Sequence, residues 1–91
     1  FTGGCGPSPT DVTPAAVAPL LTHALPGFGE LMRHTLTADA PELAASRCGA
    51  GIAADTLVIW LPGRPAQCQA ALRAIAPAVR RTCAALRQPA T

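Results

Sequence analysis

The sequence contains no lysine and few charged residues of either sign. Seven arginines stand against five acidic residues among 91, which gives a formal net charge of +2. This balance argues against nucleic-acid binding, because that function requires a clustered basic face. The missing lysine also excludes a P-loop, in which the lysine of a Gly-Lys-Ser/Thr ending contacts the nucleotide phosphates.

Long apolar runs and metal-ligand spacings are missing as well. No apolar stretch approaches the roughly 20 residues that a membrane-spanning helix needs. The cysteines form no Cys-x-x-Cys pair and lie far in sequence from both histidines, so a zinc site is not expected. The cysteines are Cys5, Cys48, Cys68 and Cys83, and the histidines are His23 and His34.

Apolar residues recur at helical spacing in several parts of the chain, and proline and glycine separate these parts. Pro26-Gly27 should end the first helix, and Pro77 should break or kink the helix that begins at Pro65. Terminal residues beyond the last helix are expected to fray. The predicted segments are helices over 14–24, 28–37, 65–76 and 78–87, and a frayed tail over 88–91.

Two strands are predicted between the helices, over 48–52 and 56–61. The three residues that join them are few enough for an antiparallel hairpin. Because the second strand is apolar almost throughout, we expect helices on both faces of its sheet. Residues 38–45 are interpreted as a connection or a short turn.

A glycine-rich turn opens the chain, and a lone carboxylate and a helix start follow it. The turn is Thr2-Gly3-Gly4-Cys5-Gly6, and Asp11 comes shortly before Thr13 and Pro14. Glycines let backbone N–H groups converge on one point and approach a phosphate closely. Thr13 is expected to cap the helix and Pro14 to begin it. A phosphate cradle beside a carboxylate is an arrangement that suits phosphoryl chemistry.

The same stretch has a second interpretation, as an ordinary glycine- and proline-rich surface turn. In that interpretation Asp11 only stabilises the start of a helix. A dinucleotide fingerprint is excluded, because Pro9 stands where Gly-x-Gly-x-x-Gly requires its third glycine.

A series of segments, in order along most of residues 1–80, resembles the second half of the MoaB/Mog family of molybdenum-cofactor biosynthesis proteins. Each segment alone is unspecific, but their order and spacing together are typical of that family. The segments are Thr2 to Gly6, Asp11 to Pro14, Leu25 to Arg33, Ser46-Arg47, Ala50 to Ile52, Thr56 to Ile59 and Leu61 to Pro65.

The resemblance implies an α/β fold with three α/β/α layers and a mostly parallel sheet. Residues 1–91 would be the C-terminal part of one such domain. A core of this size is marginal, since a chain this short buries only about 60% of its unfolded surface. We therefore expect burial against a partner. The resemblance implies a homo-trimer or a homo-hexamer, or association with a complementary N-terminal half, in the cytoplasm.

The activity implied by the resemblance is transfer of an adenylyl group from Mg·ATP to the phosphate of molybdopterin. Mg²⁺ would be the cofactor, and ATP and molybdopterin the substrates. A molybdopterin-binding or scaffold domain without catalysis is the alternative. A molybdenum insertase or nucleotide-hydrolase module is a third hypothesis, which the Asp-Val-Thr-Pro and Gly-Phe-Gly-Glu stretches disfavour.

By resemblance, Asp11 is the catalytic residue and either holds Mg²⁺ or positions the nucleotide, and Glu30 approaches the nucleotide. The glycine turn, the Ser-Arg pair and the Pro-Gly pair would bind phosphate or pterin. For the Ser-Arg pair a strand-initiating turn is the alternative, and for Glu30 a helix face or subunit interface. The residues expected to bind phosphate or pterin are Thr2, Gly3, Gly4, Cys5, Gly6, Ser46, Arg47, Pro62 and Gly63.

Four positions depart from the family pattern. Cys5 replaces threonine or serine, and within a phosphate loop it is either a reactive thiol of low pKa or a change of no consequence. Thr10 replaces an arginine, which removes an anion clamp. Trp60 replaces an asparagine and is expected at the mouth of the site, and Arg64 replaces a small polar residue. With these departures, a weakened or altered catalyst is an open alternative.

Overall fold

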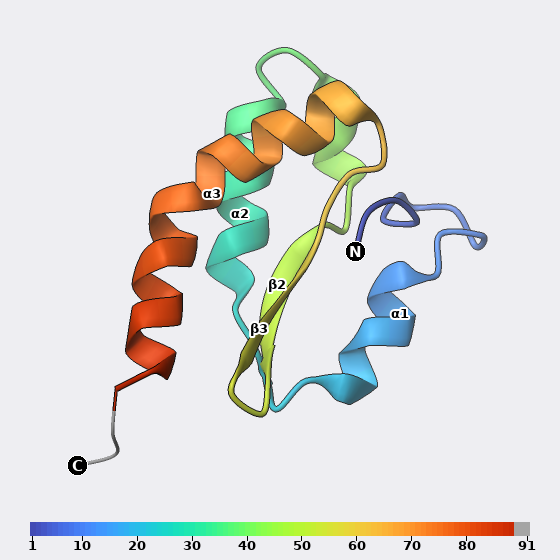
Figure 1. Cartoon of the computed structure of the whole chain (residues 1–91). Helices are drawn as coiled ribbons and strands as arrows, with labels where there is room; N and C mark the ends of the chain where they lie inside the picture. Colours follow the sequence, from blue (N-terminus) through green and yellow to red (C-terminus); the bar gives the residue numbers. More distant parts are fainter. Residues whose placement is uncertain (89–91) are drawn as a thin grey trace.

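The computed structural model describes residues 1–88. Its secondary structure alternates short helical segments with a small sheet and ends in one long helix (Figure 1). The elements in order are α1 (Thr13–Val17), the 3₁₀ helix η1 (Ala18–Leu20), β1 (His23–Ala24), α2 (Pro26–Leu36), the 3₁₀ helix η2 (Pro41–Ala45), β2 (Gly49–Ala53), β3 (Thr56–Trp60) and α3 (Pro65–Leu86).

The sheet has three antiparallel strands in the order β1-β2-β3. The hairpin of β2 and β3 confirms the two predicted strands, with Gly51 opposite Val58. Ala54 makes the turn with a positive φ of 57°. The short strand β1 pairs with the other side of β2, His23 opposite Ile52.

Parallel pairing within residues 1–88 is confined to the N-terminus, which runs beside the end of β3. Thr2 forms a parallel bridge with Leu61. The N-terminal ammonium group of Phe1 donates to the Ile59 carbonyl at 2.9 Å, and the Leu61 amide donates to the Phe1 carbonyl at 2.9 Å. The described sheet therefore differs from the mostly parallel one expected, because its main strands are joined by a hairpin and not by a helical crossover.

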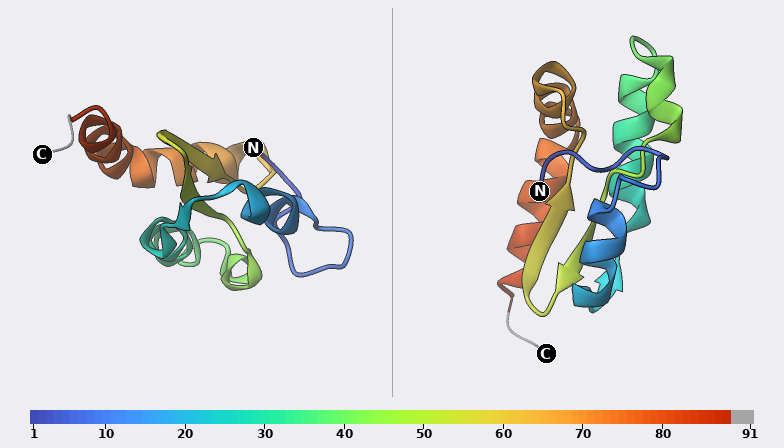
Figure 2. Two further views of the ribbon diagram at one scale, coloured as in Figure 1. Left: turned by 90° about the horizontal axis from the view of Figure 1, so that it is seen from below. Right: turned by 90° about the vertical axis from the view of Figure 1, so that its right-hand side faces the viewer.

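Helices lie on both sides of the hairpin, as its apolar strand predicted. The helices α2 and α3 pack against each other and against the hairpin. The short helices α1 and η1 lie on the opposite side of it (Figures 1 and 2). The glycine turn is at the end of the hairpin where β3 leads into α3 (Figure 1).

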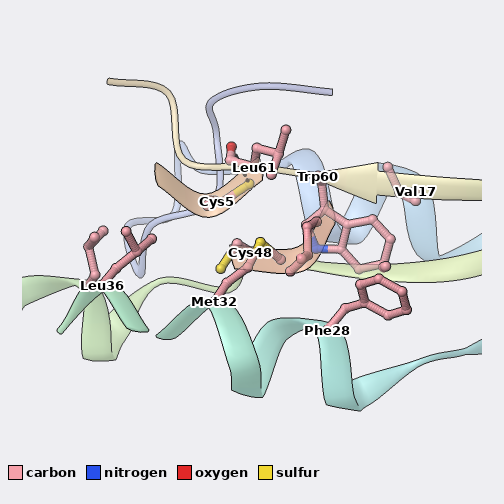
Figure 3. Packing of buried hydrophobic residues seen from close by; sticks show 12 residues of the cluster. Cys5, Val17, Phe28, Met32, Leu36, Cys48, Trp60 and Leu61 are labelled. Atoms are coloured by element: carbon pink, nitrogen blue, oxygen red, sulfur yellow. Dashed lines mark hydrogen bonds between the residues drawn. The ribbon is translucent and has the colours of Figure 1, made fainter. Parts of the chain in front are cut away.

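The core forms where α2 and α3 meet the hairpin and the N-terminal turn. Met32, Ala71 and Ile75 are completely buried. Figure 3 shows Cys48 between Cys5 and Met32, with Trp60 extending toward Phe28. The buried members of this cluster are Cys5, Val17, Phe28, Met32, Leu36, Leu43, Cys48, Ala50, Trp60, Leu61, Ala71 and Ile75.

The helix predicted over 14–24 is wrong in its second half. The α-helix ends at Val17, and Pro19 lies in the 3₁₀ turn that follows. His23 then joins the sheet. The apolar spacing was misleading, because Leu20 is 62% exposed. Backbone pairing with β2 therefore decides the conformation of this segment.

Pro77 does not break the last helix, which is another correction. One helix, α3, runs from Pro65 to Leu86 with Pro77 inside it. Proline removes one hydrogen bond, but Pro77 lies on the exposed side of a helix that Ala71 and Ile75 anchor in the core. Of the tail expected over 88–91, the residues from 89 on lie outside the described part of the chain.

Candidate functional site

The glycine turn is held in a conformation that only glycine adopts easily. Gly3 and Gly4 have φ values of 82° and 67°. Their carbonyls point toward α1, where the Thr13 hydroxyl donates to the Gly3 carbonyl at 2.8 Å and the Thr13 amide donates to the Gly4 carbonyl at 3.0 Å. Thr13 is therefore not the expected N-cap, which is Val12. It ties the turn to the helix instead.

The carbonyls of Gly3 and Gly4 face α1, whereas most backbone amides of the turn remain available to a ligand. The Gly3 amide donates to the Leu61 carbonyl at 2.9 Å. Within residues 1–88, the amides of Gly4, Cys5 and Gly6 donate to no protein acceptor. Successive free N–H groups in such a turn form a concave donor set that suits an anion.

A cavity of about 680 Å³ lies against this turn. Most of the residues predicted for the site line this cavity, although they are distant in sequence. The N-terminal turn forms one wall, η2 a second, and the loop from β3 to α3 a third. The lining residues are Gly3, Gly4, Cys5, Gly6, Pro7, Asp11, Glu42, Leu43, Ala45, Ser46, Pro62, Gly63, Arg64 and Gln67.

Three of the predicted site residues do not line this cavity. Thr2 is exposed and forms the bridge to Leu61, just after β3. Glu30 and Arg47 line a second cavity of about 460 Å³, together with Arg33 and Trp60. Glu30 therefore lies apart from the glycine turn.

Arg47 braces the N-terminal turn from the side. Its Nε donates to the Gly6 carbonyl at 2.8 Å, and its Nη2 donates to the Asp11 carbonyl at 2.5 Å. Its own amide donates to the Cys5 carbonyl. The planar guanidinium thus bridges two backbone carbonyls and fixes the stretch between them.

Segment 46–48 is itself anchored to α2. Arg33 of α2 donates from Nη1 to the carbonyls of Ser46 and Cys48, at 3.1 and 3.0 Å. The Ser46 hydroxyl is buried and accepts from the Cys48 amide at 3.3 Å. Arg33 is a positioning residue whose role was missed, because its sequence context shows a helix-face arginine and not its carbonyl partners.

Asp11 brings a carboxylate to the cavity. Its Oδ2 accepts from the Ser8 amide at 3.2 Å, and its own amide donates to the Ser8 carbonyl at 3.0 Å. Within residues 1–88 no donor contacts the other carboxylate oxygen. This local turn holds Asp11 in place and leaves one oxygen available to a ligand.

Cys5 is a buried, protonated thiol. Only 3% of it is exposed, and its Sγ donates to the Gly3 and Leu61 carbonyls at 3.3 and 3.5 Å. Burial raises the pKa of this thiol, and the nearby Cys48 and Asp11 raise it further. The interpretation as a reactive cysteine of low pKa is therefore wrong. Desolvation outweighs the favourable charges of the N-terminus and Arg47.

Trp60 does not reach the mouth of the cavity beside the glycine turn. Its side chain is buried, with 9% exposed, and its Nε1 donates to the Arg47 carbonyl at 2.8 Å. Trp60 thus supports the main chain of the residue that braces the turn. The indole contributes to packing and positioning rather than to stacking in this cavity.

Two polar side chains of the cavity, Glu42 and Gln67, were missed by the sequence analysis. Glu42 belongs to η2, which was interpreted as a connection or a short turn, and Gln67 lies in the first turn of α3. No motif marks either residue. Only the packing of η2 and α3 around the N-terminal turn brings them to the site.

Comparison with known proteins identifies the family. Residues 1–81 match the family described as "Probable molybdopterin binding domain". Over 78 residues the chain is 45% identical to molybdopterin adenylyltransferase of Helicobacter pylori, which covers 86% of this chain and 44% of that protein. Over 64 residues it is 41% identical to the Escherichia coli enzyme of the same name, which covers 70% of this chain and 33% of that one.

Solved structures agree with these sequence matches. The Mog protein of Mycobacterium ulcerans superposes with a TM-score of 0.89 at 32% identity, over 93% of this chain and 56% of that one. The MoaB protein of Thermus thermophilus superposes with a TM-score of 0.84 at 36% identity, over 93% and 54%. The chain belongs to the molybdopterin-binding MoaB/Mog family.

The chain spans less than half the length of these curated relatives and a little over half of the solved chains. The family match over residues 1–81 includes the glycine turn and all the residues that line the cavity. Among the described residues, no helix combines the length and apolar character required to cross a membrane.

Proposed function

We propose that this chain binds molybdopterin and that the complete protein transfers an adenylyl group from Mg·ATP to the molybdopterin phosphate. The main support is one arrangement: free amides of the glycine turn, the Asp11 carboxylate and the Ser46 segment share one cavity. Relatives at 41–45% identity are named molybdopterin adenylyltransferase.

In this reaction an oxygen of the molybdopterin phosphate attacks the α-phosphorus of ATP, and pyrophosphate leaves. Such a transfer depends on positioning and charge stabilisation more than on a strong base. The amides of Gly4, Cys5 and Gly6 would donate to phosphate oxygens. Thr13 and Arg47 hold the turn rigid, so that these donors are oriented before a substrate arrives.

Asp11 is the residue that we expect to hold Mg²⁺. Magnesium prefers one or two carboxylates together with waters and substrate phosphates. Asp11 fits this preference, because one carboxylate oxygen has no protein donor and the side chain lines the same cavity as the free amides. When bound there, Mg²⁺ would neutralise negative charge on the transferred phosphate.

A non-catalytic molybdopterin-binding domain is the second candidate. One observation favours it: the guanidinium of Arg47 already bridges the Gly6 and Asp11 carbonyls. This guanidinium is therefore not available for the binding of phosphate or pterin that the resemblance implied. Binding through amides alone requires less positive charge than catalysis does.

The variant Asp11→Asn separates these two functions. The asparagine oxygen still accepts from the Ser8 amide, so the fold should be preserved. Without the carboxylate, adenylyl transfer should fall by roughly 10²-fold or more, while molybdopterin binding falls much less. ATP-dependent formation of adenylylated molybdopterin by the complete protein measures the first quantity, and equilibrium titration the second.

Asp39→Asn is the matched control, since Asp39 is an exposed acid outside the cavity. It should retain the parental rate. If Asp11→Asn also transfers adenylyl groups at the parental rate, Asp11 is only a structural residue and its proposed role in holding Mg²⁺ fails. A parent protein that binds molybdopterin but transfers no adenylyl group would refute the catalytic proposal.

We also propose that the protein acts in the cytoplasm as a homo-trimer or homo-hexamer, or in association with a complementary N-terminal half. Support comes from β3, whose outer edge is paired within residues 1–88 only near its end, by Phe1, while Thr2 bridges Leu61 just beyond it. Exposed Leu31 and Leu72 add apolar surface on α2 and α3. A monodisperse monomer of these 91 residues with a sharp calorimetric transition would contradict this proposal.

A further inference from the structure

Arg64 is the only arginine that lines the cavity beside the glycine turn, within residues 1–88. Two other arginines, Arg33 and Arg47, donate to backbone carbonyls. The remaining ones lie along α3 and are exposed away from the cavity. The guanidinium of Arg64 donates to no residue of the described chain, although two carboxylates, Asp11 and Glu42, line the same cavity.

The backbone holds Arg64 close to the glycine turn. Its neighbour Gly63 approaches so closely that an added Cβ would lie 2.9 Å from the Cα of Gly3. The Gly3 amide also bonds to the Leu61 carbonyl at 2.9 Å. The loop from β3 to α3 therefore cannot move away from the turn without breaking this contact. The backbone of Arg64 is thus fixed at the wall of the cavity.

Arg64 also precedes the first turn of a long helix. It is the N-cap residue of α3, and its carbonyl accepts from the Cys68 amide at 2.8 Å. The early amides of α3 have no partners within the helix, so this end favours negative charge. The cavity thus combines three donors of positive character: the turn amides, the end of α3 and a guanidinium without a protein partner.

We propose that Arg64 binds a phosphoryl group of the substrate, opposite the amides of the glycine turn. A guanidinium contacts phosphate oxygens through two parallel N–H bonds, which suits a phosphate monoester or a diphosphate. Within the proposed function, on which this inference rests, the group is either the molybdopterin phosphate or the polyphosphate of ATP. Arg64 thereby supplies the cation that Thr10 and the engaged Arg47 do not.

Binding of simple phosphate compounds tests this role without any turnover. The complete protein is titrated calorimetrically with inorganic phosphate and with pyrophosphate, in the absence of divalent cations. Arg64→Gln should weaken binding of at least one probe by about 10- to 100-fold, the range expected for a lost charge-assisted hydrogen bond. A larger loss for phosphate indicates the monoester, and a larger loss for pyrophosphate indicates ATP.

Two further variants make the result specific. Arg64→Lys retains the charge without the planar fork and should recover part of the affinity. Arg73→Gln removes an exposed arginine of the same helix outside the cavity and should bind as the parent does. Circular dichroism on each variant verifies that it is folded.

The inference is overturned if Arg64→Gln binds both probes as tightly as Arg73→Gln does, or if the parent protein binds neither. Its failure is distinct from failure of the proposed function. Phosphate binding that depends on Arg64, in a protein that transfers no adenylyl group, would refute the catalytic proposal and support the role of Arg64.

Discussion

Arg47 offers the sharpest test of how the site is held together. Its guanidinium bridges the Gly6 and Asp11 carbonyls at 2.8 and 2.5 Å. Arg47→Ala removes both bonds, whereas Arg47→Lys retains the charge and at most one of them. If Arg47 only contacted a substrate phosphate, neither variant would lower the stability of the protein without substrate. If it braces the turn, the fork geometry matters most.

The expected magnitude follows from the two bonds. Arg47 is exposed, so each bond should contribute about 0.5–1.5 kcal/mol, as for an ordinary protein hydrogen bond. Arg47→Lys should therefore lower the free energy of unfolding by about 1 kcal/mol, and Arg47→Ala by about 2 kcal/mol. For a domain of this size, 1 kcal/mol corresponds to a decrease in Tm of roughly 4–8 °C.

Thermal unfolding measures the global effect, and hydrogen exchange measures the local one. Exchange of the hydrogen-bonded amides of Gly3 and Thr13 should accelerate in both variants, because the turn opens more often. Arg73→Ala serves as the control for losing an exposed arginine. The bracing role is refuted if Arg47→Ala has the Tm and the exchange rates of Arg73→Ala.

Two further predictions concern the turn itself. Gly4→Ala should lower the free energy of unfolding by about 2 kcal/mol, because the residue has a φ of 67° and its new Cβ would collide with the Thr13 hydroxyl. Gly27→Ala is the control and should not destabilise the protein, because its new Cβ meets no neighbour. Equal urea midpoints for the two variants would contradict this. Because the pKa of buried Cys5 is raised, the folded state retains the thiol proton to a higher pH than the unfolded state does. The free energy of unfolding is therefore fully present at neutral pH and declines as the pH rises above the thiol's unfolded pKa. Cys5→Ser should reduce that alkaline loss, and an unchanged pH profile would refute the assignment.

The sequence predicted the hairpin and α2 well, because apolar strand residues and the Pro-Gly signals are local. It failed where tertiary contacts override local pattern. Pro77 ends a helix in isolation, but packing of Ala71 and Ile75 against α2 keeps α3 continuous through it. Residues 23–24 were assigned to a helix by their spacing, yet their pairing with β2 makes them a strand.

Much of the candidate site was predictable as well, since the glycine turn, Asp11 and Ser46 do meet in one cavity. The partners of each side chain were not predictable. Whether a guanidinium contacts a ligand or a backbone carbonyl depends on a few ångströms of tertiary placement. For that reason the family pattern could mark Arg47 but could not show that it braces the turn.

The parallel contact at the N-terminus also has a consequence for protein engineering. Phe1 and Gly3, on either side of Thr2, are already hydrogen-bonded to Ile59 and Leu61. They therefore fix the register of any peptide fused upstream that extends this ladder along β3. Side chains alternate between the two faces of a sheet. A linker lengthened by one residue would turn every upstream side chain to the opposite face, whereas one lengthened by two would restore it. Fusions joined here must therefore be designed in steps of two residues.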